Sequence, residues 1–320
     1  MNNQNISGLI ISVLICTHNR AELLNDVLST LIQQDLSFDQ FEILIIDNNS
    51  TDGTKNVSQK FVNKYPRIRY LFEKNLGLSH ARNRGWKEAA GKYVAYTDDD
   101  CRIPKNWLSK AKQIIGEKEP AIFGGPYFPF YDSPKTKWFK DSYGSKENGP
   151  FARRLCNNEY LSGGNIFIKK TILLNLNGFK TNLGMQGSAI GYAEETELIT
   201  RLFLQKPKEI VYYDPDLFVE HLVPHRKMSL VWIIKSRFSM GKSNFLMSSN
   251  KDNQNRSFLL ILPKFIISSS KLLLSTLKGI LLRDRKQYPF IQNYIYERTS
   301  HVFSELGFYY QKILLKIVKH

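Results

Sequence analysis

The chain has 320 residues, of which 42% are hydrophobic and 23% are charged. This composition excludes wholesale disorder, and the length suits one domain of about 200–250 residues with an appendage. Three scattered cysteines, Cys16, Cys101 and Cys156, exclude a disulfide framework and a CxxC metal site, so we expect buried thiols in a reducing compartment.

The positive charge is concentrated in the last part of the chain. The net charge is +16, and the residues from Pro224 on contain 17 Lys+Arg against four Asp+Glu, a net of +13. The residues before Pro224 therefore have a net charge of only +3. This asymmetry indicates an anionic surface as the partner of residues 226–320. Because the sequence has no RRM, KH or zinc-knuckle pattern, we expect no nucleic-acid partner.

The first hundred residues alternate between strand-like and helix-like segments. The apolar run Leu9–Cys16 is too short for a signal peptide and follows a polar start without a basic segment, so we interpret it as a buried strand of a cytoplasmic protein. Further strands are expected at Phe41–Ile46, Ile68–Phe72 and Tyr93–Tyr96. Helices are expected at Ala21–Gln34, from the turn that ends at Gly53 to about Lys64, and at Leu78–Ala90. The alternation predicts an α/β fold with a mostly parallel sheet and helices on both faces.

The second half is less regular. We expect a long irregular and functional segment at Gly124–Pro150, a strand at Ile166–Lys169, and helices at Thr171–Leu176 and Glu194–Leu204. The largely apolar stretch Phe258–Leu282 has polar residues spaced alternately by four and three, which form one stripe on a helix: Lys264, Ser268, Lys271, Ser275 and Lys278. We interpret it as a helix lying at a membrane surface, with a helix packed on the protein or a transmembrane span as alternatives.

Acidic and amide side chains follow the predicted strands. Asp98, Asp99 and Asp100 come directly after the strand that begins at Tyr93, and three adjacent carboxylates repel one another unless a cation lies between them. A hard divalent cation there would keep positions open for phosphate oxygens, which indicates a diphosphate-bearing substrate. The Asx-rich turn 47–53 directly follows the predicted strand Phe41–Ile46. For both this turn and the triple aspartate, a solvated turn is the alternative.

These segments, at this spacing, resemble the family 2 glycosyltransferases of the GT-A fold over about residues 9–225. Thr17–Arg20 resembles the opening nucleotide-contact turn of the family, Asn75–Gly85 its asparagine/glycine/arginine segment, and the triple aspartate its DxD-type motif. By that resemblance the nucleotide sugar contacts Thr17, Asn19, Arg20, Asp47, Asn49, Asn75, Gly77, Arg82, Asp98 and Asp99. The implied cofactor is a divalent cation, Mn²⁺ or Mg²⁺, held by Asp100, Asp98 and His221.

The resemblance extends into the second half of the chain. Leu161–Asn165 is similar to the segment near donor sugar and acceptor, which implies contacts from Gly164 and Asn165. Gly191–Leu198 resembles the acidic ED motif, although its second acid is Glu195 and not aspartate. We expect Glu195 to be the general base, with Glu194 as the alternative, and Arg226 to pair with the diphosphate. Glu197 is expected to be a solvated or salt-bridged helix residue.

The resemblance implies an inverting transfer from a nucleotide-diphosphate sugar, UDP by default, to a hydroxyl of a lipid-linked saccharide or cell-surface polysaccharide precursor. We expect a catalytic domain at 1–225, with a nucleotide-sugar half to about 105 and an acceptor half from about 106. A basic amphipathic helical region at 226–320 would hold it on the inner face of the cell membrane. A nucleotidyltransferase and a sugar-nucleotide-binding homologue without transferase activity are the alternatives.

Overall fold

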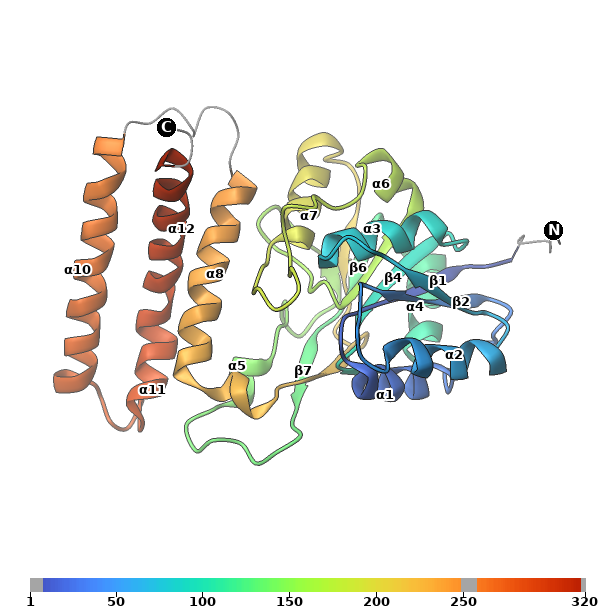
Figure 1. The fold of residues 1–320 in the computed structure, drawn as a ribbon, viewed down its shortest axis with the longest axis horizontal. Helices are drawn as coiled ribbons and strands as arrows, with labels where there is room; N and C mark the ends of the chain where they lie inside the picture. The colour runs from blue at the N-terminus through green and yellow to red at the C-terminus, as the bar shows by residue number, and fades with distance from the viewer. Residues whose placement is uncertain (1–7, 249–257, 318–320) are drawn as a thin grey trace. The chain divides into compact units, whose positions relative to one another are not determined.

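A computed structural model of the protein describes residues 8–248 and 258–317, in two compact units (Figure 1). Of the described residues, the first unit contains 8–130, 144–181 and 194–222. The second contains 131–143, 182–193, 223–248 and 258–317. The division therefore lies close to residue 225, but two segments from earlier in the chain belong with the later helices.

The first unit is built on an eight-stranded sheet in the order β3-β2-β1-β4-β9-β6-β10-β8. Strands β1 to β4 run parallel to one another, and β10 runs parallel to β6, whereas β9 is antiparallel to β4 and β6, and β8 is antiparallel to β10. The strand bounds are β1 Ile11–Thr17, β2 Phe41–Asp47, β3 Ile68–Phe72, β4 Tyr93–Asp98, β6 Ile122–Gly124, β8 Arg153–Arg154, β9 Asn165–Lys169 and β10 Val211–Tyr213. The mostly parallel α/β sheet expected from the sequence is confirmed.

Helices cover both faces of this sheet, and each face has its own hydrophobic core. Because side chains alternate along β1, Ile11 and Val13 enter one core and Leu14 the other. The first core includes α1 and α4, and the second includes α3, α6 and α7. The helices of the unit are α1 Ala21–Leu31, α2 Thr54–Lys64, α3 Leu78–Glu88, α4 Trp107–Lys118, α6 Lys170–Asn175 and α7 Glu194–Gln205.

A small second sheet lies within the same unit, in the order β5-β11-β7. Its strands are β5 Cys101–Arg102, β7 Tyr127–Phe130 and β11 Val219–Leu222. The segment expected to be irregular at 124–150 thus contains β7 and the one-turn helix α5 Asp141–Gly144. The sequence does not reveal β7 because its partner β11 lies about ninety residues later in the chain.

The second unit is helical. It contains a turn of 3-10 helix, His225–Met228, then α8 Leu230–Ser248, α10 Phe258–Leu282, α11 Ile291–Tyr294, a π-helical turn Ile295–Thr299 and α12 Ser300–Ile317. The earlier segment 131–143 belongs here because Trp138 and Phe139 pack in one apolar cluster with Met228 and Ile233. Tyr143 also stacks on Tyr296, with ring centroids 3.9 Å apart.

Candidate active site

The acidic cluster lies at the carboxyl end of β4, beside the end of β1. The Asp99 side chain is turned toward the β1–α1 loop, where the Thr17 hydroxyl donates to Oδ2 at 2.7 Å and Arg20 Nη1 donates to Oδ1 at 2.7 Å. Arg20 also contacts Asp100 Oδ2 at 3.3 Å. Burial raises the pKa of Asp99 to about 6, against the lowering effect of Arg20. Two residues of the predicted nucleotide-contact turn thus hold the middle aspartate.

The other two aspartates converge with a histidine. One ligand atom each from Asp98, Asp100 and His221 lies within 4.8 Å of the others, and His221 Nε2 is 3.3 Å from Asp100 Oδ1. His221 comes from β11, which pairs with β5 directly after the aspartates. Two carboxylates and an imidazole suit a borderline divalent cation such as Mn²⁺. The residues present therefore fit the cation that the sequence predicted.

Tyr127 connects the members of this group. Its hydroxyl donates to Asp98 Oδ2 at 2.9 Å, and its ring stacks on the His221 ring with centroids 5.1 Å apart. Tyr127 is only 5% exposed. The sequence does not single out this residue, because a tyrosine in an aromatic-rich segment carries no signal of its own until β7 is known to pair with β11.

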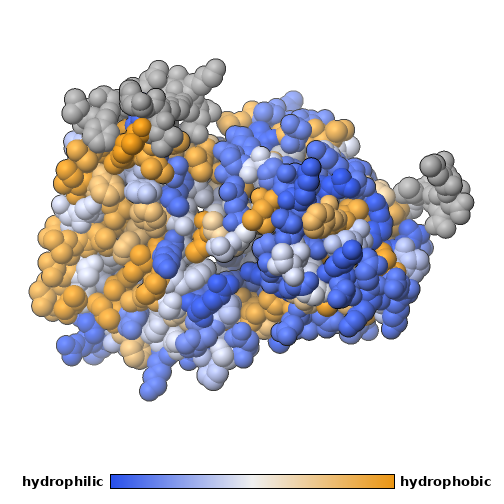
Figure 2. All heavy atoms as spheres, in the orientation of Figure 1, coloured by the Kyte–Doolittle hydropathy of each residue, from blue (hydrophilic) through white to orange (hydrophobic). Residues whose placement is uncertain are grey.

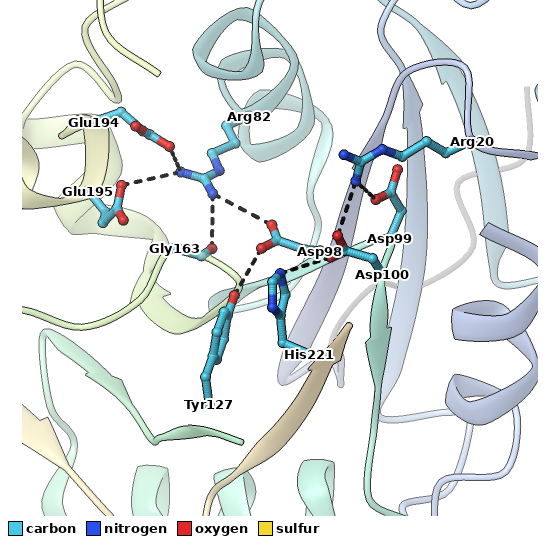
Figure 3. A network of polar contacts seen from close by, with 10 residues as sticks. All are labelled: Arg20, Arg82, Asp98, Asp99, Asp100, Tyr127, Gly163, Glu194, Glu195 and His221. Atoms are coloured by element: carbon cyan, nitrogen blue, oxygen red, sulfur yellow. Dashed lines mark hydrogen bonds and ion pairs between the residues drawn. The ribbon is translucent and has the colours of Figure 1, made fainter. Parts of the chain in front are cut away.

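Arg82 lies between the acidic cluster and the start of α7 (Figure 3). Its guanidinium donates to Glu194 Oε1 at 2.9 Å and to the Gly163 carbonyl at 3.1 Å, and it approaches Asp98 Oδ1 at 4.0 Å. The side chain is 4% exposed. Burial disfavours the charged form, but the neighbouring carboxylates, led by Glu194, outweigh it and raise the pKa of Arg82. Arg82 thus remains a fixed cation that ties Glu194 to Asp98.

Glu194 and Glu195 occupy the first turn of α7, where the helix dipole favours negative charge. Glu195 Oε2 lies 4.0 Å from Arg82 Nη1, and its side chain is 17% exposed against 6% for Glu194. One buried oxygen of each carboxyl has no hydrogen-bond partner. Burial and then the charge of Glu195 raise the pKa of Glu194 to about 8. The two neighbouring carboxyls therefore favour keeping one proton between them near neutral pH.

Two adjacent glycines allow this close arrangement. A Cβ on Gly163 would lie 2.5 Å from Arg82 Nη2, and one on Gly164 would lie 1.9 Å from the Tyr127 hydroxyl and 2.3 Å from Asp98 Oδ2. Any side chain at either position would displace the charged groups. Gly164, which the resemblance placed near the nucleotide sugar, thus borders the acidic cluster through its backbone.

The predicted nucleotide-contacting loops lie side by side. Asp47 ends β2, and its carboxylate accepts hydrogen bonds from the Ser50 amide at 2.9 Å and the Tyr70 hydroxyl at 2.8 Å. The Asn19 side chain accepts one from the Thr51 amide at 2.7 Å, which joins the two loops. Tyr70 is a second residue that the sequence analysis missed.

Neighbouring positions in these loops differ in exposure. Asn49 and Asn75 are exposed, while Gly77 is buried and its amide donates to the side chain of Asn48 at 2.7 Å. Asn48 also donates to the Asn75 carbonyl at 2.7 Å. The loop after β3 is therefore fastened to the loop after β2, and the exposed amides remain available to a ligand.

Three candidate residues, Asn165, Arg226 and Glu197, do not belong to the group of contacts around Arg82 and the acidic cluster. Asn165 is fully buried, and its amide is bonded to the carbonyls of Pro126 and Leu217 and to the Trp107 indole, so we infer that it supports the framework. Arg226 belongs to the second unit. Glu197 is ion-paired with Lys180 and Arg201 at 2.8 and 2.7 Å, the salt-bridged helix residue that the sequence predicted.

The model of the family described as glycosyl transferase family 2 matches residues 12–176, which is more than half of the chain. The chain belongs to this family. The matched segment contains the strands and loops that carry the acidic cluster, Arg82 and the Gly163–Gly164 pair, and it ends before α7.

A glucosyl-dolichyl phosphate glucuronosyltransferase of Haloferax volcanii is 22% identical over 244 residues, which cover 74% of this chain and 77% of that protein. Two further relatives match over only 27% and 57% of their own length.

Among solved structures, a mannosyltransferase from Pyrobaculum calidifontis in complex with GDP-Man and Mn²⁺ has a TM-score of 0.58 at 17% identity, covering 98% of this chain and 76% of that one. Residues 1–349 of TarS from S. aureus, in complex with UDP, have a TM-score of 0.54 at 16% identity and cover 97% and 92%. These neighbours show that the chain has the GT-A fold.

Proposed function

We propose that this glycosyltransferase is an inverting enzyme that moves a sugar from a nucleotide-diphosphate sugar to an acceptor hydroxyl. The observation that carries the proposal is the Arg82 bridge, because it joins a carboxylate pair at a helix start to an acidic group suited to a cation. A base for the acceptor and a site for the diphosphate then lie on opposite sides of one guanidinium. We take UDP as the default nucleotide of the donor; one structural neighbour was solved with UDP and another with GDP-Man.

Glu195 is the proposed general base. Glu194 is clamped by Arg82, whereas Glu195 is the more exposed of the two. Glu195 would take the proton of the acceptor hydroxyl as that oxygen forms a bond to the anomeric carbon. The bond from that carbon to the diphosphate breaks at the same time, and its electron pair leaves with the nucleoside diphosphate.

Asp98, Asp100 and His221 are the proposed cation ligands, and a bound cation would offset the charge that develops on the leaving diphosphate. Tyr127 holds the Asp98 carboxylate in place, and Arg20 with Thr17 keeps Asp99 away from the ligand set. Asp47, Asn49 and Gly77 border the space proposed for the nucleoside.

A lipid-linked saccharide is the proposed acceptor, and the inner face of the cell membrane is the proposed place of work. The Haloferax relative is named for a dolichyl phosphate substrate, which supports a lipid-borne acceptor. The net charge of +13 from Pro224 on supports attraction to anionic headgroups.

The test measures hydrolysis and transfer with a panel of UDP-, GDP- and dTDP-sugars, with EDTA, Mn²⁺ or Mg²⁺. We expect turnover of one nucleotide class, loss in EDTA and recovery with a divalent cation. A Glu195→Gln variant should lower kcat by about 10²–10⁴-fold with donor binding unchanged. The matched Glu194→Gln variant should lose less, because it removes a positioning contact only. If Glu194→Gln loses more, the base assignment is wrong; hydrolysis of no donor would favour a binding-only protein.

A further inference from the structure

Helix α10 turns polar side chains inward. Its Ser268 hydroxyl donates to Glu305 Oε2 of α12 at 3.0 Å, and its Ser275 hydroxyl is 2.8 Å from that of Thr299. Lys271 Nζ lies 3.6 Å from Glu305 Oε2. In a water-soluble bundle the apolar face of a helix faces its neighbours, so α10 is oriented in the opposite sense.

The outward side of α10 is apolar. The segment Ile261–Leu282 has a mean hydropathy of 1.5 over its most apolar window, and only 11% of that window is buried. Figure 2 shows hydrophobic side chains gathered over this helix, at the left of the view. The large apolar residues of α10 that are at least 39% exposed are Leu262, Ile266, Ile267, Leu273, Leu274, Leu277, Ile280, Leu281 and Leu282. A continuous apolar surface of this kind marks an interaction site.

Basic side chains border this surface. Lys264, Lys271 and Lys278 recur at every seventh residue, so they form a line along the helix, and all three are exposed. Arg285 and Lys286 follow the end of the helix and are exposed too. Lysine is depleted at interfaces between proteins, whereas it suits the phosphate level of a bilayer, where its stem stays among apolar groups.

We propose that α10 lies lengthwise in one leaflet of a phospholipid membrane, with its apolar side among the acyl chains and its lysine line at the headgroups. A helix of 25 residues is about 37 Å long, which is enough to cross a bilayer core of about 30 Å. Crossing would, however, place the lysine line and its partner Glu305 in hydrocarbon, which is costly. The inference deepens the proposed function. It rests on that function only for the identity of the membrane, the inner face of the cell membrane.

Vesicle flotation of the full chain, without donor or acceptor, tests the proposal independently of transferase activity. We expect the protein to float with neutral phosphatidylcholine vesicles even in about 0.5 M NaCl, where charge attraction is screened. Leu273→Glu with Leu274→Glu should lower the partition coefficient by about 100-fold. The matched control is Leu174→Glu, which alters a 66% exposed leucine of α6 and should float like the wild type.

A second pair, Leu281→Glu with Leu282→Glu, repeats the test at the end of the helix, and circular dichroism checks that each variant is folded. Flotation that is equal for wild type and folded variants would overturn the proposal, and so would binding to anionic vesicles only. A lipid-free dimer that the Leu273/Leu274 variant breaks, measured by light scattering, would instead assign the surface to a second copy of the chain.

Discussion

The hydroxyl of Tyr127 joins β7 to Asp98 through the hydrogen bond to Oδ2. A Tyr127→Phe variant keeps the ring that stacks on His221 but removes the donor. Groups that orient metal ligands typically change metal affinity by about 10–100-fold. We expect a rise of about tenfold in the Mn²⁺ concentration that gives half-maximal donor hydrolysis, with little change in kcat at saturating Mn²⁺.

The control for this prediction is Tyr131→Phe. Tyr131 also donates its hydroxyl to an aspartate, Asp141, but in the second unit. Its removal should leave the Mn²⁺ dependence unchanged. An unchanged Mn²⁺ dependence in Tyr127→Phe would mean that the hydroxyl does not position a cation ligand.

The raised pKa of Glu194 predicts a pH-dependent stability. The folded state keeps this proton up to about pH 8, whereas the unfolded chain releases it near 4.5, the ordinary pKa of a glutamate. The stabilising contribution is therefore complete below pH 4.5 and is lost as the pH rises through 8. We expect the Tm of the wild type to fall between pH 5 and pH 8.5 more steeply than that of Glu194→Gln, by a few degrees (~1 kcal/mol or more).

Thermal unfolding at several pH values measures this difference in slope. Asp52→Asn is a suitable comparison, because hydrogen bonds to Thr54 and Ala21 lower the pKa of Asp52 despite some burial. A lowered pKa has the opposite sign, since its contribution is lost as the pH falls. Parallel curves for wild type and Glu194→Gln would contradict the buried proton.

The sequence predicts the residues of the site better than their contacts. Three aspartates after a strand indicate a cation site from residue type alone, and the structure brings two of them to His221. That Asp99 turns to Arg20 instead follows from the geometry of the β1–α1 loop, which no spacing rule reveals. Tyr127 and Tyr70 were missed for the same reason, because their partners lie on other strands.

At the scale of elements, local signals predict the longer and more regular elements well. Strand β3 and helix α10 have the predicted bounds, and α3 and α7 begin at the predicted residues. Short strands such as β7 and β11 depend on pairing between distant segments, so their sequences carry little information.

Helices α8 and α12 pack through two glycines. A Cβ on Gly307 would lie 1.9 Å from the Phe238 carbonyl oxygen, and one on Gly241 would lie 1.9 Å from the Ser304 carbonyl oxygen. Because both obstacles are backbone atoms, an added methyl group must push the helices apart. Gly307→Ala should therefore destabilise the second unit by about 1–3 kcal/mol, measured as a shift of its thermal or urea transition.

Gly116 of α4 is a glycine with open space around it, in contrast to Gly241 and Gly307. No atom lies within 4 Å of a Cβ there, so Gly116→Ala adds helix propensity without a clash and should stabilise the first unit by about 0.5–1 kcal/mol. If both substitutions stabilise, the close approach of α8 and α12 is not present in solution.

At the scale of the whole molecule, charge and hydropathy predict a distinct second part but not its membership. A composition change near residue 224 locates the boundary of the basic helices. The segments 131–143 and 182–193 belong with them through packing, as when Asn293 donates to the Trp138 carbonyl at 2.6 Å. No feature of composition identifies such long-range packing.

The charge asymmetry leads to the last prediction. If the basic second unit faces an anionic leaflet, vesicles with about 30% phosphatidylglycerol should bind the chain at least tenfold more tightly than neutral vesicles at low salt. In about 0.5 M NaCl this preference should disappear while the salt-resistant binding through α10 remains. Arg285→Gln with Lys286→Gln should weaken low-salt binding to the anionic vesicles by up to about 30-fold, since each cation near the surface contributes about 1 kcal/mol. Lys55→Gln with Lys60→Gln, two exposed lysines of the nearly neutral first part, should not. Equal losses from both pairs would mean that total charge, and not the second unit, directs the protein to the membrane.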